Sequence, residues 1–356
     1  MKVAVGLSGG VDSSVAALLL LREGHEVFGL IMKLWPGPGA PAAARSACYG
    51  PDEAEDIRAA GDVCGRLGIP LRVVDCAADY ESLVLRYFRE AYAAGTTPNP
   101  CVRCNQLVKF GVLPAAARAA GLAFDRFATG HYARIGRDAA TGRYLLKRAV
   151  DPAKDQSYFL YRLSQAQLAE TVFPLGELAK ARVRALAREA GLAVHDRRES
   201  QDFYAGDIGD VVGPGPGDGE IVDRDGRVLG RHRGVGFYTI GQRKGLGLAS
   251  PVPLYVVAID AAANRLVVGP EHETLRRAAV VRDCVWGPFE ALAAPVRVRA
   301  KVRSGGRPVA AAISPLAGGL CRVDFDEPVA AVAPGQSAVF YDGETVVGGG
   351  VIESSS

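Results

Sequence analysis

The chain has 356 residues, of which 49% are hydrophobic and 23% are charged, the balance of a folded protein with a substantial core. Its 42 Lys and Arg residues nearly cancel 39 Asp and Glu residues, which excludes a polybasic tail or an acidic disordered chain. No apolar run reaches the roughly eighteen residues of a membrane span, and no secretory signal precedes the first predicted strand. We therefore expect no membrane partner, a cytoplasmic location and reduced thiols for the seven cysteines.

Strand and helix patterns alternate over the first third of the chain, and the pattern from about 154 to 194 is mainly helical. Short β-branched runs predict the strands, and apolar residues spaced three and four apart predict the helices between them. Such alternation is typical of a parallel sheet with helices on both faces. The predicted strands cover 2–6, 27–32, 71–75 and 127–129, and the predicted helices cover 11–22, 52–67, 80–94 and 179–190.

The pattern changes after residue 200, where glycines and prolines crowd 209–219 and predict a linker. Short β runs separated by turn signals then follow. The predicted β runs cover 220–222, 236–240, 254–260, 265–269, 296–302, 320–325 and 338–341. The predicted fold class is an α/β parallel-sheet domain at 1–200, a small β-rich domain at 201–270 and a C-terminal β-barrel domain at 271–356.

Basic side chains gather between residues 276 and 307. Eight basic residues stand there against Asp283 and Glu290, and their alternation with apolar residues over 296–303 predicts a strand with one basic face. Such a stripe can follow a phosphate backbone, and it can equally be the solvated outer face of a strand. The eight residues are Arg276, Arg277, Arg282, Arg297, Arg299, Lys301, Arg303 and Arg307.

The segment Gly6-Leu7-Ser8-Gly9-Gly10-Val11-Asp12-Ser13-Ser14 lies where the first predicted strand ends and the first predicted helix begins. Glycines there let the backbone approach a ligand, and the free amides at a helix start bind anions. The serines add hydroxyl donors, so the segment predicts a phosphate-binding loop. No Gly-Lys-Ser/Thr closes it, so it is not a Walker A loop and better suits the pyrophosphate released by cleavage at the α-phosphate.

Cys101 and Cys104 form a Cys-x-x-Cys pair that follows Asn99-Pro100. Two sulfurs at this spacing can form a disulfide or share a metal, and one thiolate can lower the pKa of the other. No second cysteine pair or histidine pair follows at ligand spacing, so structural zinc is not expected. Cys48 lies in a separate loop. The cysteines that fall in apolar patterns typical of core packing are Cys64, Cys76, Cys284 and Cys321.

The glycine- and serine-rich loop resembles the PP-loop of ATP pyrophosphatases, which adenylate a carbonyl oxygen and then replace it with nitrogen or sulfur. Further strings, in the same order along the chain, resemble the tRNA-specific 2-thiouridylase family, so the resemblance covers nearly the whole chain. These strings are 99–105 with Lys109-Phe110, 128–132, 154–160, 173–178, 239–247 and 334–341.

The resemblance implies a Rossmann-like PP-loop domain with a helical tRNA-binding extension, and a sulfurtransferase activity. The enzyme would use ATP and Mg²⁺ to adenylate the C2 oxygen of a flipped wobble uridine of tRNA, then install sulfur from a cysteine desulfurase, a sulfur carrier or sulfide. The implied ATP-binding residues are Gly6, Leu7, Ser8, Gly9, Gly10, Val11, Asp12, Ser13, Met32 and Gly130. The implied tRNA-binding residues are Asn99, Pro100, Cys101, His131, Lys154, Asp155, Gln156 and Gln336.

The catalytic residues expected on this basis are Cys104, Cys101, Cys48 and Asp12, where Asp12 would position Mg²⁺-pyrophosphate or handle a proton. The chain departs from the family pattern in two places, because family members carry Asp at the position of Cys101 and a second thiol at the position of Tyr204. A phenol cannot carry a persulfide, so two replacements remain open. In one, one thiol of the Cys-x-x-Cys pair carries the sulfane sulfur and the other resolves it. In the other, Cys48, Cys101 and Cys104 hold a [4Fe–4S] cluster whose fourth iron binds sulfide.

Two other functions stay compatible with the sequence. A PP-loop synthetase of the amidotransferase type would transfer nitrogen, but it leaves the Cys-x-x-Cys pair and the β-rich C-terminal half unexplained. A catalytically inactive tRNA-binding homologue is suggested by Tyr204, but the intact loop between Ser8 and Ser14 argues against it.

Overall fold

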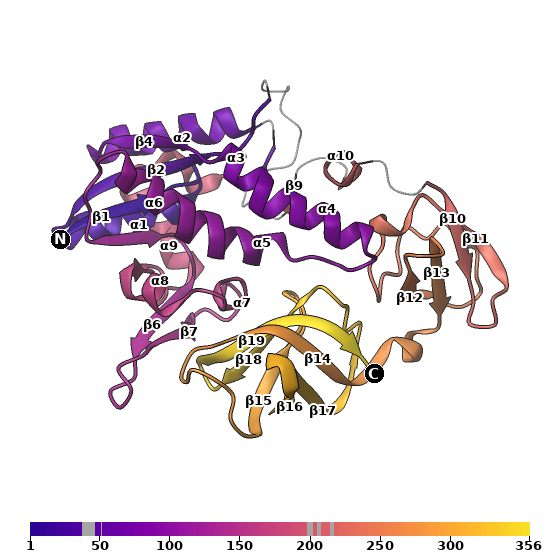
Figure 1. Cartoon of the computed structure of the whole chain (residues 1–356). Helices are drawn as coiled ribbons and strands as arrows, with labels where there is room; N and C mark the ends of the chain where they lie inside the picture. Colours follow the sequence, from indigo (N-terminus) through magenta and orange to yellow (C-terminus); the bar gives the residue numbers. More distant parts are fainter. Residues whose placement is uncertain (38–46, 51, 198–201, 205–207, 214–216) are drawn as a thin grey trace. The chain divides into compact units, whose positions relative to one another are not determined.

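The computed structural model describes residues 1–37, 47–50, 52–197, 202–204, 208–213 and 217–356, and Figure 1 traces the whole chain. The chain divides into two compact units. The first unit contains residues 1–84, 101–206 and 344–346, and the second contains residues 85–100, 207–343 and 347–356. No helix within the described ranges is both long enough and apolar enough to cross a membrane.

The first unit is built on a parallel five-stranded sheet with the strand order β4-β2-β1-β5-β8. Strand β1 pairs with β2 on one side and with β5 on the other. Because the chain first builds the sheet outward through β2 and β4 and only then adds β5, the strand order reverses between β1 and β5. In open parallel sheets, ligands bind beyond the carboxyl ends of the strands at this point. The strands are β1 (Lys2–Gly6), β2 (Glu26–Lys33), β4 (Leu71–Asp75), β5 (Arg126–Thr129) and β8 (Thr171–Val172).

Helices cover this sheet through apolar faces that match its buried strands. Val3 of β1 shares a core cluster with Ala17 of helix α1 and Ala60 of helix α2. A second cluster joins α1 to helix α9, where Val15 packs with Val183. The helices of this part of the chain are α1 (Val11–Arg22), α2 (Glu53–Leu67), α3 (Ala77–Tyr80), α5 (Pro100–Arg103), α6 (Leu113–Ala119), α7 (Ser157–Leu160), α8 (Gln165–Glu170), α9 (Lys180–Glu189) and the 3₁₀-helix η3 (Ala193–Asp196).

Two wider π-helices, η1 (Glu81–Leu85) and η2 (Cys104–Val112), follow α3 and α5 directly. Such helices are rare and occur mostly at functional sites. Because η2 bonds each amide five residues back, Cys104 and Lys109 lie on nearly the same face, which an α-helix would not allow. The remaining strands of this unit are the parallel pair β3 (Ala47–Tyr49) and β9 (Asp202–Tyr204), and the hairpin β6 (Ala133–Arg137) and β7 (Tyr144–Arg148).

The second unit contains a small four-stranded sheet with the order β11-β10-β13-β12. Its core is formed by Ile221, Val256 and Leu266, each fully buried, because strand residues alternate between the core and the surface. The elements around this core are α4 (Arg86–Ala93), α10 (Ile208–Val212), β10 (Gly219–Val222), β11 (Val228–His232), η4 (Val235–Phe237), β12 (Tyr255–Asp260), β13 (Arg265–Gly269) and η5 (Glu271–Thr274).

The C-terminal strands form a closed barrel, because β14 pairs with β17 and also with β19. In β15, Val298 and Ala300 point into the barrel core whereas Arg297 and Arg299 are exposed, which confirms the predicted strand with one basic face. The barrel elements are β14 (Leu275–Trp286), β15 (Val296–Lys301), β16 (Val309–Pro315), η6 (Ala317–Gly319), β17 (Cys321–Ala330), β18 (Ser337–Asp342) and β19 (Thr345–Ser355).

The predicted fold class is confirmed, since a parallel-sheet α/β part is followed by a smaller β sheet and a closed barrel. One local prediction was wrong. The strand expected at 236–240 is not formed, and the short helix η4 covers 235–237, between Gly234 and Gly241, whose φ angles are 118° and 86°. The helical stretch expected at 80–94 is confirmed, because α3, the π-helix η1 and α4 follow one another without a break over 77–93. The linker expected at 209–219 contains part of α10, and its residues 214–216 lie outside the described ranges.

We expect Ile313→Ala to lower the free energy of unfolding of the barrel by about 2–5 kcal/mol, because its side chain is fully buried in the barrel core. Leu316→Ala is the matched control, since Leu316 is 40% exposed and its loss should cost less than about 0.5 kcal/mol. Urea denaturation followed by the fluorescence of Trp286, which packs against this core, measures both changes. Equal losses in the two variants would contradict this core.

Candidate functional site

The loop after β1 fixes its own shape through serine hydroxyls. The backbone amide of Ser8 donates to Ser13 Oγ at 3.2 Å, and Ser14 Oγ donates to the Gly10 carbonyl at 2.8 Å. In the described part of the chain no side chain caps the start of α1 at Gly10. The first amides of this twelve-residue helix are therefore available to an anion, as the predicted phosphate loop requires.

Two glycines allow neighbouring backbone to approach this loop. Gly9 has a φ of 67°, and a Cβ there would lie 2.6 Å from the Asp56 carbonyl oxygen. A Cβ on Gly130, just after β5, would lie 2.5 Å from the amide nitrogen of Ser13. Both distances are too short for any side chain, so glycine is required at each position. The structure thus places the predicted ATP-binding residue Gly130 directly against the start of α1.

Met32, the remaining residue predicted to bind ATP, lies near the carboxyl end of β2 and is half-buried. Because parallel strands end at one edge of their sheet, Met32 shares that edge with Gly6 at the end of β1. The side chain is therefore available to an apolar part of a bound molecule, such as an adenine base.

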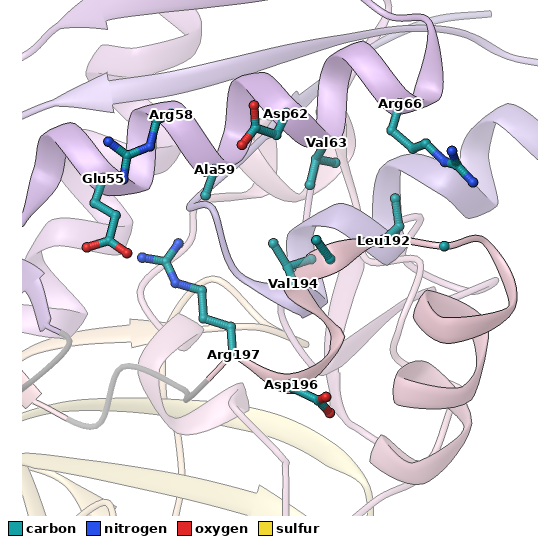
Figure 2. Close-up of a pocket in the computed structure, with 12 residues that line it drawn as sticks. Glu55, Arg58, Ala59, Asp62, Val63, Arg66, Leu192, Val194, Asp196 and Arg197 are labelled. Carbon is teal, nitrogen blue, oxygen red and sulfur yellow. The ribbon is translucent and has the colours of Figure 1, made fainter.

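Arg197 supports the loop from a segment that the sequence analysis did not single out. Its Nη1 donates to the Gly9 carbonyl at 2.9 Å, and its Nη2 donates to Asp56 Oδ1 at 2.6 Å. Burial raises the pKa of Asp56 to about 6 even though Arg197 opposes that shift. Figure 2 shows Arg197 on the wall of a pocket of about 540 Å³ between α2 and the segment that holds η3.

Lys180 neutralises the acidic residue of the loop and was also missed from the sequence. Its ammonium lies 2.7 Å from both carboxylate oxygens of Asp12, and the Tyr132 hydroxyl donates to Asp12 Oδ1 at 2.8 Å. Lys180 is only 9% exposed although it is the first residue of α9. A lysine at a helix start carries no signal for such a role, since its partner lies 168 residues away. The loop therefore has a cation beside it despite lacking a Walker lysine.

The three cysteines expected to be catalytic come from three separate elements of the first unit. Cys48 lies on β3, Cys101 on α5 and Cys104 at the start of η2. Burial and, after it, the negative charges of these three thiolates raise the pKa of Tyr80 well above its ordinary value. All three sulfurs therefore lie within electrostatic reach of Tyr80, at the end of α3.

Cys104 is the most desolvated of these thiols. Burial raises its pKa to about 11, the ammonium of Lys109 opposes this rise, and the thiolate of Cys48 adds to it. Lys109 reaches Cys104 because both lie on one face of the π-helix η2. Only a small fraction of Cys104 is therefore the reactive thiolate at neutral pH. Lys109 increases that fraction, because its ammonium lowers the pKa of the thiol.

A [4Fe–4S] cluster requires several thiolates that converge on one point. Among the described residues, no group of three or more His, Cys, Asp or Glu side chains could hold a metal ion. Cys48 is exposed, whereas Cys101 and Cys104 are only partly exposed. The three thiols present in this arrangement therefore do not fit the predicted cluster.

Tyr204, at the position where the sequence predicts a missing thiol, pairs with the strand that carries Cys48. In the parallel pair β3–β9, Tyr49 lies opposite Tyr204. The ring of Tyr49 also stacks on Phe203 and, with 5.2 Å between ring centroids, on Tyr80. This aromatic cluster fixes β3 and β9 beside α3.

Several residues expected to contact tRNA are engaged within the protein. The Asp155 carboxylate, only 4% exposed, accepts from Arg148 Nε and from the Ser157 amide. Gln156 Oε1 accepts from the Tyr132 amide at 3.0 Å, and in the second unit Gln336 Nε2 donates to the Pro98 carbonyl. These side chains hold turns in place.

The other residues in that set differ in exposure. Asn99 is buried, Pro100 begins α5, and Lys154 is half-exposed. His131 accepts or donates a hydrogen bond with Thr129 Oγ1 at 2.8 Å, and burial lowers its pKa well below the ordinary value. His131 is therefore neutral at pH 7 and cannot attract phosphate by charge. Contact of these residues with tRNA stays a prediction.

The basic stripe of the barrel is less positive than its sequence indicates. Arg297 pairs with Asp326 on β17, and Arg282 pairs with its neighbour Asp283. Arg299 Nη2 donates to the Pro308 carbonyl. Exposed pairs of this kind contribute little to stability, but they offset part of the charge that a phosphate backbone would meet.

The fold is that of an α/β protein whose uncapped helix start, the predicted phosphate loop, lies at the switch point of its parallel sheet. Three family models match in order along the chain: the tRNA methyl transferase HUP domain at 1–204, the tRNA methyl transferase PRC-barrel domain at 210–270 and the aminomethyltransferase beta-barrel domain at 276–352.

Curated relatives match at full length. The tRNA-specific 2-thiouridylase MnmA of Endomicrobium trichonymphae is 46% identical over 356 residues, covering 99% of each chain. The proteins of the same name from Nostoc punctiforme and Moorella thermoacetica are each 45% identical, over 100% and 98% of this chain and 99% of their own. The chain belongs to the tRNA-specific 2-thiouridylase family, which confirms the resemblance found in its motifs.

We expect Lys180→Met to weaken the binding of Mg²⁺-ATP by about tenfold, because it removes the largely buried ammonium that lies beside the phosphate loop. Lys180→Arg keeps the cation and should lose less affinity. Isothermal titration calorimetry measures both dissociation constants, with thermal unfolding as the check that each variant is folded. An unchanged dissociation constant for Lys180→Met would show that the pair does not act on the nucleotide.

We expect the alkylation rate of Cys104 by iodoacetamide to rise nearly tenfold per pH unit from pH 7 to pH 9, because its pKa of about 11 lies above that range. Lys109→Met should slow alkylation at each pH, since it removes the cation that lowers this pKa, and Lys109→Arg should not. Mass spectrometry of the Cys104 peptide gives the rates. A rate that levels off below pH 8.5 would contradict the predicted burial of the thiol.

Proposed function

We propose that this protein is a tRNA-uridine 2-sulfurtransferase, which converts the wobble uridine of tRNA to 2-thiouridine with formation of AMP and pyrophosphate. The observation that carries the proposal is the identity of about 45% with relatives of that name along the whole chain. The intact loop at 6–14 supports it, because a non-reacting homologue would have no need of a phosphate site that excludes side chains at Gly9 and Gly130.

The activation step belongs to the phosphate loop. The amides at the start of α1 bind the phosphates of ATP, and the C2 oxygen of uridine attacks the α-phosphorus so that pyrophosphate leaves. Asp12 is the carboxylate of the loop that would hold Mg²⁺, which neutralises phosphate charge when bound. In this step Lys180 is released from Asp12 and its ammonium faces the departing pyrophosphate. AMP is then the leaving group at C2.

The sulfur step belongs to Cys104 and Cys101, which lie three residues apart at the junction of α5 and η2. The terminal sulfur of a Cys104 persulfide attacks C2 and displaces AMP. The Cys101 thiolate then attacks Cys104 Sγ, and the sulfur–sulfur bond to the base breaks with its electron pair on the transferred sulfur. The sulfane sulfur is thereby reduced and two thiols are oxidised to a disulfide, which a dithiol reductant reopens for the next turnover.

The remaining partners complete the proposal. The sulfur comes from a cysteine desulfurase, a sulfur carrier or sulfide, and the reduced thiols that it needs suit a cytoplasmic location. The part at 1–200 carries the chemistry, and the parts at 201–270 and 271–356 hold the anticodon stem by its backbone. The uncovered basic residues of the barrel, such as Arg303 and Arg307, are available for that contact.

We expect Cys104→Ala to abolish 2-thiouridine synthesis while ATP still binds, because the loop and the thiol belong to different steps. Purified enzyme, tRNA transcript, ATP and a persulfide donor are combined, and the nucleosides are separated by liquid chromatography and mass spectrometry. AMP and pyrophosphate should form with the wild-type protein. Formation of ADP without AMP would overturn the proposed function, whereas 2-thiouridine made by Cys104→Ala would overturn the role of Cys104 in the sulfur step.

A further inference from the structure

Cys48 differs from the other two thiols of the site in its contact with solvent. It is exposed, whereas Cys101 and Cys104 are partly covered. Cys104 is desolvated strongly enough to raise its pKa to about 11. A sulfur donor with a persulfide on its own surface meets Cys48 more readily than Cys104, because thiol exchange depends on access as well as on the thiolate fraction.

Cys48 and Cys104 flank the same short segment of chain. Tyr49, the neighbour of Cys48, stacks on Tyr80 with 5.2 Å between ring centroids. Arg103, the neighbour of Cys104, donates through Nε to the carbonyl of Leu83 at 2.6 Å, one turn beyond Tyr80. The thiolate of Cys48 is also one of the charges that raise the pKa of Cys104. Backbone placement and electrostatics thus agree that the two thiols lie near the same α3–η1 junction.

The neighbours of Cys48 hold it in this place. The pairing of β3 with β9 sets Tyr49 opposite Tyr204, and Trp35 packs edge-on against Tyr49 with 5.0 Å between ring centroids. Strand pairing and the ring contacts of Tyr49 therefore hold the backbone next to Cys48 in place. A tyrosine at 204 therefore has a structural use at this site, which is to position the strand that carries Cys48.

We propose that Cys48 is the receiving thiol of this site, which accepts sulfane sulfur from a persulfide donor and passes it to Cys104. The proposal rests on the proposed function. In the first exchange the Cys48 thiolate attacks the terminal sulfur of the donor persulfide, and the donor leaves as a thiolate with the electron pair of the broken bond. In the second, the Cys104 thiolate attacks the terminal sulfur on Cys48, and Cys48 leaves as a thiolate.

Neither exchange changes the number of electrons in the system, so no oxidant is needed. The sulfur moves inward because the high pKa of Cys104 makes it a poor leaving group once it carries the persulfide. Cys101 stays reduced during loading and is available to resolve the persulfide after transfer to the base. This arrangement gives each of the three thiols a separate task, which a cluster or a two-thiol scheme does not.

Loading can be measured without tRNA or ATP, so its outcome is separate from that of the proposed function. A cysteine desulfurase loaded with ³⁵S persulfide is mixed with the protein, the thiols are trapped with iodoacetamide, and the labelled peptides are identified by mass spectrometry. In Cys104→Ser the label should accumulate on Cys48. In Cys48→Ser, labelling of Cys104 should fall by about tenfold or more.

A small donor, glutathione persulfide, separates the two sources of sulfane sulfur. Because glutathione persulfide can enter a partly covered site, sulfur transfer from it to Cys104 should fall less in Cys48→Ser than sulfur transfer from the desulfurase.

Cys284→Ser is the matched control, since Cys284 is a partly exposed thiol of the barrel. In this variant Cys104 should be loaded at the wild-type rate. Label on Cys101 rather than Cys48 in Cys104→Ser, or full labelling of Cys104 in Cys48→Ser, would overturn the proposal. Loss of 2-thiouridine synthesis with normal loading would instead count against the proposed function.

Discussion

The start of helix α1 is enclosed by backbone on two sides, and the site depends on that close approach. Gly9 and Gly130 each lie where a Cβ would come within 2.6 Å of a neighbouring backbone atom. Because glycine has no side chain, strand β5 and helix α2 can approach the loop closely while the amides of the loop stay accessible to an anion. The position of the loop at the switch point of the sheet then follows from strand order, because β1 and β5 end side by side.

The negative charge of Asp12 in this loop is balanced by a residue that is distant in the sequence but close in space. Asp12 would be an unfavourable neighbour for phosphate, yet its carboxylate is held by Lys180 and Tyr132 in a largely covered setting. In such a setting an ion pair interacts more strongly than at an exposed surface, and losing one partner is costly. The negative charge of Asp12 is thus already offset by Lys180, and in the proposed mechanism this lysine turns to phosphate when Mg²⁺ takes its place.

The thiols of the site differ in how far they are exposed to solvent, and their expected reactivity differs accordingly. Desolvation protects Cys104 from casual reaction and makes it a poor leaving group, while Lys109 on the same face of η2 limits that effect. Exposure gives Cys48 the opposite properties. The wider π-helix matters because it brings Lys109 into register with Cys104, and the β3–β9 pair matters because it carries Cys48 to the same segment. Sulfur chemistry is thus distributed over elements that are distant in sequence.

Features that depend on local periodicity could be predicted from the amino-acid sequence. Alternating strand and helix patterns predicted the parallel sheet, glycine and serine spacing predicted the loop at 6–14, and alternation over 296–303 predicted a strand with a basic outer face. The strand expected at 236–240 was wrong, since the short helix η4 starts there between two glycines with positive φ, a local choice that β propensity does not report.

Tertiary structure alone decided which side chains meet. Lys180 reaches Asp12 across 168 residues, and Asp155 and Gln156, which the sequence offers as contacts for RNA, are engaged in holding turns. Strand pairing and ring stacking place Cys48 near the α3–η1 junction, close to which Cys104 also lies. No local sequence pattern predicts these contacts. The physical reason is that hydrogen bonds, ion pairs and desolvation depend on distance in space, whereas a sequence pattern reports only the repeat along the chain.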